Sequence, residues 1–543
     1  MTSSKQINTQ DLLNKRIQVE DQLATVRYVG PVPPTKGEWL GVEWDNVSRG
    51  KHDGVHEGVR YFTCSTPNSG SFIRFSPKTT TGRSFLSALM NKYIDDEMKG
   101  NDYNAQSDLQ TLHWAGNRKI EVEALGWDKV RRKQSHLDRL TEVGLSFEQI
   151  SSAGMQGEIE ACNLNIIDLN LSKNLLSDWE TVARICEQLK KLQILRLNYN
   201  RFQPLQSPPP QFIEAFKNLK SLSLNYTRIS WSQVELLEPS LPNLDNLQLG
   251  FNNMRHFGTS DTKRSQPNDR LVHGFRKLKI LNLESNGIDS WEEVARFSKL
   301  ESLEVLFLTT NKLDKIVYPS NDAFPKLRFL IVSENKIADW TSVDELNKFP
   351  ALKELRIKNN PFLDGVKPTE SNASLIGRVK GLTMLNGSTI TLGDRADAER
   401  YYLRLCVREF KTPEEIEKVH PRYKELCDIH GTPTADELLA QSMSGMLKDR
   451  LITVVITHRK SLTDSEHVKK VTKRLLGTMT IRSLKNLLQK LFGVSTFDQS
   501  LFRIPKMEEG MDEQEPVEMN DDLRELSYYD LVAGEEIILI KAE

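Results

Sequence analysis

One pattern of apolar and polar positions recurs through the middle of this 543-residue chain. It reads L-x-x-L-x-L-x-x-N-x-L, with a polar slot after three apolar positions and one more apolar residue behind it. The slot holds, in turn, Asn174, Asn200, Thr227, Asn252, Asn286, Asn311, Asn335 and Asn360. Successive slots lie 24 to 27 residues apart, except for one spacing of 34. This period predicts a stack of similar units, because one such unit cannot bury its own apolar face.

Each unit is predicted to supply one short strand whose leucines point inward, while the slot residue turns the chain and caps backbone groups. A degenerate first unit at 140–150 brings the number of repeats to nine. The period is typical of leucine-rich repeats, so we expect an α/β solenoid over 126–402. Residues 382–387 and 395–402 resemble the C-terminal cap of short leucine-rich repeats, which shields the end of the apolar core. A polar insertion at 255–270 explains the long spacing and is predicted to be an exposed loop.

Most leucines and asparagines of the repeats are therefore structural, and any contact with a partner protein should use the side chains between the leucines. These side chains face outward on the concave side of a solenoid. The candidate contacts are Arg196, Gln248, Phe307 and Arg356.

The amino-terminal segment, 8–82, shows a different pattern of short alternating runs separated by Gly and Pro turns. The runs at 17–19, 24–29 and 41–44 predict a small antiparallel β-barrel. A polar turn, Gly50-Lys51-His52-Asp53-Gly54, follows them. Taken alone, this turn is either a plain hairpin loop or a recognition loop.

The residues around the turn favour recognition, because together they resemble a CAP-Gly domain, whose hallmark is Gly-Lys-Asn-Asp-Gly. Gly37-x-Trp39-x-Gly41 comes before it, and Tyr61-Phe62-x-Cys64 and Gly70-Ser71-Phe72-x-Arg74 come after it. The resemblance implies that this domain binds acidic C-terminal tails ending in Glu-Glu-Tyr or Glu-Glu-Phe, as in α-tubulin.

The resemblance also implies which residues contact the tail. They are Trp39, Trp44, Gly50, Lys51, His52, Asp53, Gly54, Phe62 and Arg74. Lys51 and Arg74 are suited to carboxylates through charge-assisted hydrogen bonds. The three aromatic side chains in this set are equally compatible with a plain core.

Two departures from the family pattern predict a weaker tail site. His52 replaces the family's Asn, and Pro34 stands where a groove aromatic is common. Unlike asparagine, a histidine at this position could titrate near neutral pH.

The carboxyl-terminal segment, 449–543, is predicted to be a ubiquitin-like β-grasp domain of the α+β class. Apolar runs at 451–456, 501–504 and 536–540 read as strands, and 480–492 has helical spacing with Thr480 as a candidate N-cap. The printed sequence ends in Lys-Ala-Glu rather than Gly-Gly. We therefore expect a docking module and not a conjugated modifier. Segments 83–125 and 403–448 are predicted to be a linker and a polar helical connector.

Composition narrows the function further. With 73 basic and 74 acidic residues, the net charge of −1 gives no general attraction to nucleic acid or to anionic membranes. Five scattered cysteines without a CxxC pair fit a reducing compartment and provide no metal site. No signal-peptide core, membrane-spanning run, phosphate-binding loop or catalytic motif is found in the sequence. We expect a non-enzymatic protein without cofactor that binds neither nucleic acid nor membranes.

The order of modules resembles that of the tubulin-folding cofactor E family. The resemblance implies a chaperone of the cytoplasm and cytoskeleton that captures α-tubulin. It implies that cofactors B, C and D act with it to assemble the α/β heterodimer, which it can also dissociate. The ubiquitin-like end would dock another cofactor or the proteasome. Two alternatives stay open, a microtubule-associated adaptor and a ubiquitin-pathway adaptor.

Overall fold

The structure is a computed structural model. It describes residues 8–93, 137–258, 271–319, 322–410, 412–433, 451–462, 464, 466, 468–504, 516–529 and 531–541. Several predicted segments therefore lie wholly or partly outside the described part. They are most of the expected linker, the first residues of the expected solenoid, most of the insertion, the end of the connector and the last two residues. None of the helices within it is long and apolar enough to cross a membrane.

The chain divides into two compact units, which we describe separately. The first unit contains Met1–Leu313 and Pro319–Leu327, and the second contains Asp314–Tyr318 and Arg328–Glu543.

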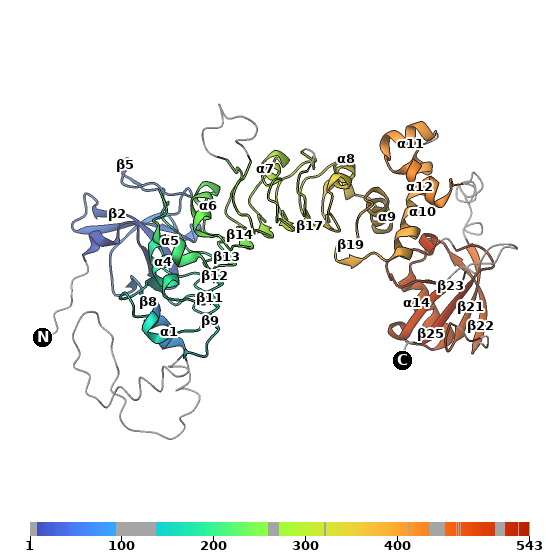
Figure 1. Ribbon diagram of the computed structural model, residues 1–543, viewed down its shortest axis with the longest axis horizontal. Coiled ribbons are helices and arrows are strands. Elements are labelled where there is room, and N and C mark those ends of the chain that lie inside the picture. Colours follow the sequence, from blue (N-terminus) through green and yellow to red (C-terminus); the bar gives the residue numbers. More distant parts are fainter. Residues whose placement is uncertain are drawn as a thin grey trace, which may run out of the picture. The chain divides into compact units, whose positions relative to one another are not determined.

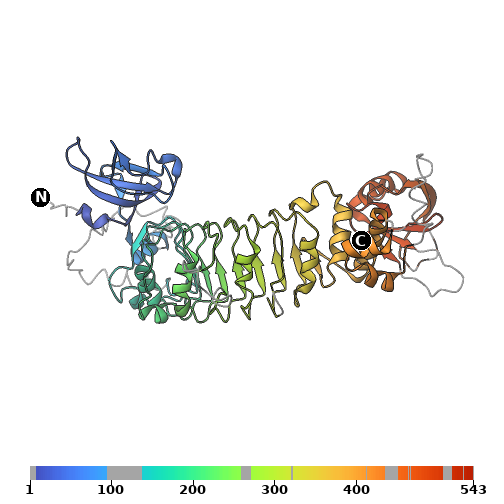
Figure 2. The ribbon, with the colours of Figure 1, turned by 90° about the horizontal axis from the view of Figure 1, so that it is seen from above.

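The amino-terminal domain of the first unit is the predicted small antiparallel β structure, drawn in blue in Figures 1 and 2. Its strands are β1 (Arg16–Val19), β2 (Gln22–Pro31), β3 (Glu38–Trp44), β4 (Val55–His56), β5 (Val59–Arg60), β6 (Gly70–Ile73) and β7 (Thr79–Thr80). Five of them form one sheet in the order β6-β3-β2-β1-β7, and β4 pairs with β5. Short 3₁₀ helices precede β1 (Thr9–Leu12) and follow β3 (Val47–Arg49). The core beneath the sheet is formed by Leu12, Ile17, Ala24, Val26, Leu40, Val42 and Trp44.

The repeats of the first unit each place one three-residue strand in a parallel ladder. The strands are β9 (Glu142–Gly144), β11 (Asp168–Asn170), β12 (Ile194–Arg196), β13 (Ser221–Ser223), β14 (Asn246–Gln248), β15 (Ile280–Asn282) and β16 (Val305–Phe307). Figure 1 shows β11 to β14 side by side, with helices α4 to α6 on one side of them. The helices of these repeats are α4 (Trp179–Glu187), α5 (Gln211–Phe216), α6 (Trp231–Leu237) and α7 (Trp291–Ala295), and short 3₁₀ turns lie at Glu160–Cys162 and Glu238–Ser240.

The register of the ladder confirms the predicted inward leucines. Leu169 pairs with Leu195, Leu195 with Leu222, and the alignment continues through Leu247 and Leu281. All of these leucines are buried. Because strand side chains alternate, the residues on either side of each leucine face outward.

The polar slots are buried and hydrogen-bonded across repeats, as their position in the pattern predicts. The amide nitrogen of Asn200 donates to the carbonyl oxygens of Leu197 in its own repeat and Leu171 in the previous one, at 2.9 and 3.0 Å. Its side-chain oxygen accepts from the backbone N–H of Asn174 at 3.0 Å. The slot residue thus satisfies backbone groups that the strand ladder leaves without partners.

The beginning of the expected linker, residues 83–93, forms a strand and a helix. Strand β8 (Arg83–Ser84) pairs with β10 (Ile150–Ser152), and helix α1 spans Phe85–Tyr93. Phe85, Ala88 and Leu89 of this helix are fully buried. Their apolar spacing is helical, but the run is too short to stand out without the surface that it covers.

The second unit holds the remaining repeats and the cap. Its elements are β17 (Phe329–Ile331), α8 (Thr341–Asp344), β18 (Glu354–Arg356), α9 (Pro368–Arg378), β19 (Met384–Leu385), β20 (Ser388–Thr389), α10 (Leu392–Glu409), α11 (Pro413–Val419) and α12 (Tyr423–His430), with 3₁₀ turns at Glu345–Lys348 and Pro361–Leu363. Helix α10 runs through the predicted boundary between cap and connector. The connector is helical as predicted, but it packs around its own core of Tyr402, Leu403, Cys406, Ile416, Tyr423 and Leu426.

The core beside the cap contains a histidine that must stay neutral. His420 is 5% exposed, and its Nδ1 accepts from the guanidinium of Arg378 at 3.0 Å and lies 2.8 Å from the hydroxyl of Tyr402. Glu409 reaches the other ring nitrogen at only 3.6 Å. Burial, and then the charge of Arg378, lower the pKa of His420 to about 4.

We expect the cap to lose about 2 kcal/mol of stability between about pH 7 and about pH 5. The unfolded chain binds a proton at His420 near the ordinary pKa, whereas the folded chain does so only near pH 4. Stability is therefore lost as the pH falls through this window. Hydrogen exchange of residues 392–430 in urea at the two pH values measures the change. In His420→Gln the dependence should flatten, and an unchanged dependence would contradict the assignment.

The carboxyl-terminal domain has the predicted β-grasp topology. Its elements are β21 (Leu451–Arg459), β22 (Lys469–Leu476), α14 (Ile481–Phe492), β23 (Gln499–Ile504), β24 (Val517–Glu518) and β25 (Glu536–Lys541), with 3₁₀ turns at Thr496–Asp498 and Leu526–Tyr529. The sheet order is β22-β21-β25-β23-β24, and β21 and β25 are parallel. The hydroxyl oxygen of Thr480 accepts from the N–H of Ser483 at 3.3 Å, which confirms the predicted N-cap of α14.

Candidate functional site

The Gly-Lys-His-Asp-Gly turn is held against strand β6 by backbone hydrogen bonds. The N–H groups of Lys51 and His52 donate to the carbonyl oxygen of Gly70, at 2.7 and 3.2 Å, and Gly70 donates back to His52 at 2.7 Å. Gly54 closes the turn with φ of +97°, and a Cβ there would lie 2.0 Å from the carbonyl oxygen of Phe62. Only glycine fits this position, so the turn has one conformation that presents Lys51 outward.

Beneath the turn lies a cluster of rings centred on Phe72, which we call the Phe72 cluster. Its members are Tyr28, His52, His56, Tyr61, Phe62 and Phe72. The ring of Phe72 lies between 5.1 and 6.2 Å from each of the other five. Phe72, Tyr61 and Tyr28 are half-buried, so this cluster presents aromatic surface next to the turn.

His52 is neutral and offers one hydrogen-bond donor. Its Nδ1 accepts from the N–H of Gly54 at 3.0 Å, which places the ring proton on Nε2. Burial lowers the pKa of His52, and the nearby His56 lowers it further. The replacement of the family's Asn thus supplies an N–H donor instead of a carboxamide, without adding positive charge at neutral pH.

The two charged residues of the turn, Lys51 and Asp53, differ in whether they form an ion pair within the domain. Lys51 is exposed and forms no ion pair within the described part of the chain. Asp53 pairs with Arg60 at 3.0 Å, and the hydrogen bond from Arg60 holds the pKa of Asp53 below its usual value. Lys51 is therefore available to an incoming carboxylate, whereas Asp53 stabilises the turn.

Arg74 is engaged with the loop that precedes β3. Its guanidinium donates to the carbonyl oxygens of Lys36 and Glu38, the latter at 3.0 Å, and lies 4.1 Å from the ring centre of Trp39. The indole N–H of Trp39 donates to Thr35 at 2.7 Å. Arg74 thus positions Trp39. The predicted contact of Arg74 with a tail carboxylate would have to use the guanidinium N–H groups that are not bonded to Lys36 and Glu38.

The sequence left open whether Trp44 and Phe62 belong to the core, and both are buried. Trp44 is 2% exposed, packs within the domain core and carries the guanidinium of Arg49 over its outer ring face. Trp44 is therefore a core residue of the domain. Phe62 is 7% exposed and contributes to the site by supporting His52 and Phe72.

The four solenoid candidates all occupy the third position of their strands. Arg196 pairs with Asp168, and Gln248 bonds Asn246 and Asn282 at 2.7 and 2.8 Å. Phe307 is partly exposed in the first unit. In the second unit, Arg356 is exposed and stacks over Phe329 at 5.4 Å. Their role in contacting a partner stays a prediction.

The sequence analysis missed a row of rings directly before the polar slots. Tyr199 stacks on Tyr226 at 4.3 Å, Tyr226 stacks on Phe251 at 4.2 Å, and Lys173 lies 4.6 Å from the ring centre of Tyr199. All four residues have φ between +54° and +63°, a left-handed conformation that bulky residues seldom adopt. The aromatic residues one position before three successive slots, at 200, 227 and 252, were the signal that could have revealed this row.

The comparisons with known proteins agree with this architecture. A CAP-Gly domain model matches residues 13–77, and a leucine rich repeat model matches residues 273–337. With the β-grasp domain, these modules define a multidomain protein of three different module types.

Relatives that match nearly the whole chain identify the family. Tubulin-specific chaperone E of Bos taurus is 34% identical over 97% of this chain and 98% of its own length. Tubulin-folding cofactor E of Arabidopsis thaliana is 33% identical over 89% of each chain. The chain belongs to the tubulin-specific chaperone E family. A solved structure, the C-terminal ubiquitin-like domain of mouse tubulin-specific chaperone e, is 22% identical over 19% of this chain and 96% of that one, with a TM-score of 0.15.

Proposed function

We propose that this protein is a tubulin-folding chaperone that binds α-tubulin and assembles or dissociates the α/β heterodimer. The observation that carries the proposal is the match of nearly the entire chain to tubulin-specific chaperone E. In this proposal the protein acts by binding alone, with cofactors B, C and D as partners, in the cytoplasm and on the cytoskeleton. Any nucleotide involved would belong to tubulin.

The amino-terminal site supports recognition of the α-tubulin tail. Lys51 offers a free ammonium group to the acidic side chains, and His52 offers an N–H donor. The neighbouring Phe72 cluster offers rings against which the terminal aromatic side chain of the tail can pack. An exposed site of this kind is weak by itself, because solvent screens its charges.

A weak tail site suffices when a second contact is tethered to it. The amino-terminal domain and the first repeats belong to one compact unit, in which Arg228 of the repeats donates to Glu43 of the domain at 2.9 Å. We propose that the outward side chains of the repeats, including Arg196, Gln248, Phe307 and Arg356, hold the tubulin body. Engagement of the body raises the effective concentration of the tail at the Lys51 site. The ubiquitin-like domain would dock a further cofactor or the proteasome.

Lys51→Ala should weaken binding of an α-tubulin tail peptide about three- to tenfold while leaving the fold intact, since its ammonium group makes no internal ion pair. Arg74→Ala should weaken binding and also loosen the Trp39 loop, because two backbone carbonyl groups lose their donor. Fluorescence anisotropy with the labelled peptide measures the first effect, and hydrogen exchange of residues 35–40 measures the second. If both variants kept full affinity for the peptide, the tail would bind somewhere other than this site.

Native mass spectrometry of the protein mixed with soluble α/β-tubulin tests the proposed function. A complex that contains α-tubulin without β-tubulin is the expected result. A complex with the intact heterodimer only, abolished by removal of the tubulin tail, would instead indicate a microtubule-associated adaptor. Capture of the proteasome that requires residues 451–541, without any tubulin complex, would indicate a ubiquitin-pathway adaptor.

A further inference from the structure

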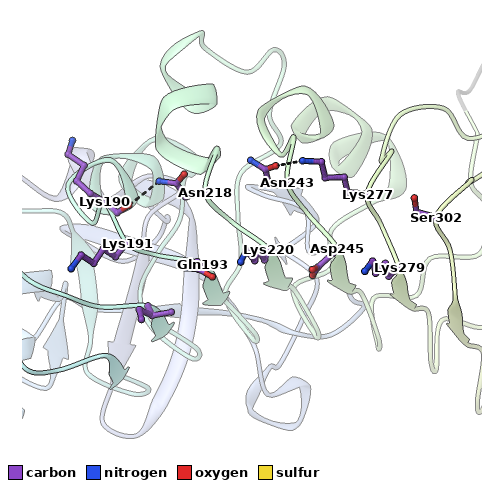
Figure 3. A pocket seen from close by; sticks show the side chains of 11 residues that line it. Lys190, Lys191, Gln193, Asn218, Lys220, Asn243, Asp245, Lys277, Lys279 and Ser302 are labelled. Atoms are coloured by element: carbon purple, nitrogen blue, oxygen red, sulfur yellow. Dashed lines mark hydrogen bonds between the residues drawn. The ribbon is translucent and has the colours of Figure 1, made fainter.

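A hollow of about 730 Å³ lies on the first unit, at the ends where the strands of the repeats begin. Five lysines line it, and they come from three separate stretches of the sequence. They are Lys190, Lys191, Lys220, Lys277 and Lys279. Asp245 is the only acidic residue among the residues that line the hollow. Figure 3 shows these side chains near the N-terminal ends of consecutive strands.

The strand register brings the lysines together. Gln193, Lys220, Asp245 and Lys279 each stand directly before a strand, in four successive repeats. Their backbone groups are bonded to one another: Lys220 donates to Gln193 at 2.8 Å, Asp245 to Lys220 at 2.9 Å, and Lys279 to Asp245 at 2.8 Å. The backbone is therefore satisfied within the ladder, and recognition at this edge falls to the side chains.

The charges of this row are largely uncompensated. Lys191, Lys220 and Lys279 are exposed and form no ion pair with any residue that the structure describes. Lys277 donates to the side-chain oxygen of Asn243 at 2.6 Å, which keeps its ammonium group at the hollow. Lys190 lies 3.5 Å from Glu160, and Asp245 stands between Lys220 and Lys279 in the row, so two carboxylates face five lysines. A local excess of positive charge thus stands on a chain whose net charge is −1.

We propose that this hollow, the lysine row, binds an acidic stretch of a partner polypeptide in extended conformation. Neighbouring parallel strands are about 4.8 Å apart, so Lys220 and Lys279, two strands apart, are separated by roughly 10 Å at the backbone. An extended peptide places side chains of one face about 7 Å apart, and flexible lysine side chains cover the difference. Successive carboxylates of such a peptide reach successive lysines.

The residues of the lysine row favour a polypeptide over a nucleic acid. The lining contains no aromatic ring on which bases could stack and no arginine fork for phosphate. Asp245, in the middle of the row, repels a continuous phosphate backbone but can accept from a peptide N–H. Neighbouring amide side chains offer further partners to a peptide backbone.

This inference goes beyond the proposed function, because it concerns a surface distinct from the Lys51 site and does not depend on the identity of the client. An acidic segment bound here would be recognised by side-chain charge along its length. A C-terminal aromatic residue or a free carboxyl terminus would not be needed.

The test measures binding of a labelled, C-terminally amidated decaglutamate peptide to the full chain by fluorescence anisotropy. The chain carries Lys51→Ala, so that the amino-terminal site does not contribute. Lys220→Glu/Lys279→Glu should weaken binding at least about tenfold, because two attractive contacts become repulsive. Affinity should also fall when the salt concentration rises from about 50 to about 300 mM.

The matched control is Lys312→Glu/Lys336→Glu, which makes the same change of charge on two exposed lysines directly after polar slots. It should change affinity by less than about twofold. Equal losses in both pairs would overturn the proposal, since net charge alone would then explain binding. Equal affinity for a decaglutamine peptide, or tighter binding of single-stranded oligothymidylate, would also overturn it. Should the glutamate pair lower the melting temperature, Lys220→Gln/Lys279→Gln replaces it, with an expected loss of about threefold or more.

Discussion

Asn286→Ala is expected to destabilise the repeats of the first unit by about 3–5 kcal/mol. Asn286 is fully buried. Its oxygen accepts from the N–H groups of Asn252 and Met254 at 2.9 and 3.1 Å, and its nitrogen donates to the carbonyl oxygen of Leu249 at 3.0 Å. Alanine leaves these backbone groups without partners in a place that water does not reach, and each lost partner costs about 1–3 kcal/mol.

Hydrogen exchange at increasing urea concentration, followed by mass spectrometry of peptides from residues 245–290, measures the free energy of opening. Asn282→Ala is the matched control, since it removes the same side chain from the same repeat. Asn282 is half-buried, donates to the side chain of Gln248 and accepts from the backbone N–H of Glu284, both at 2.8 Å. Because water can replace these partners at the half-exposed strand face, the loss of Asn282 should cost only about 1 kcal/mol. Equal effects of the two substitutions would show that the buried slot has no special role.

Phe72→Ala is expected to reduce affinity for an α-tubulin tail peptide about 100-fold or more. The ring of Phe72 touches both the turn, through His52 at 5.1 Å, and the rest of the Phe72 cluster, through Tyr61 at 5.4 Å. A central aromatic anchor of a binding site is typically worth about 2–4 kcal/mol. Its removal takes away the surface for the terminal ring of the tail and the support of His52. Isothermal titration calorimetry on the full chain measures the change.

Ile73→Ala controls for the stability of the domain. Ile73 follows Phe72 in β6, where successive side chains point to opposite faces, and it packs against the domain core. The control should lower the melting temperature of the domain while the folded protein keeps its affinity. If both variants lose affinity in proportion to the fraction unfolded, Phe72 acts on folding and not on recognition.

The turn and the repeats could be predicted because their information is local. Lys51 and Gly54 lie in one contiguous motif, and Asn200 and Asn286 recur at a fixed period with leucines at fixed offsets. The same short-range chemistry repeats in every unit, so each repeat reinforces the interpretation of the next. Thr480 was identified for the same reason, since an N-cap needs only the residues that follow it.

The engagement of Arg74 and the burial of Trp44 could not be predicted in this way. Arg74 donates to the carbonyl oxygens of Lys36 and Glu38 only because β3 and β6 pair. The sequence alone does not distinguish an arginine with such partners from one that is free to bind a ligand. In the sequence, a tryptophan at position 44 is equally suited to a ligand contact and to the domain core. The side of the sheet to which it points decides between them.

By itself, the sequence determined the three modules, the position of the recognition turn and the inward residues of the repeats, because periodicity and contiguous motifs express local chemistry. Tertiary structure alone decided which distant side chains meet. The Phe72 cluster draws rings from β2, β6 and the segments between them, and the lysine row unites Lys190 and Lys279 through strand register. Such meetings depend on hydrogen-bonded pairing over long sequence separations, and no local pattern in the chain records them.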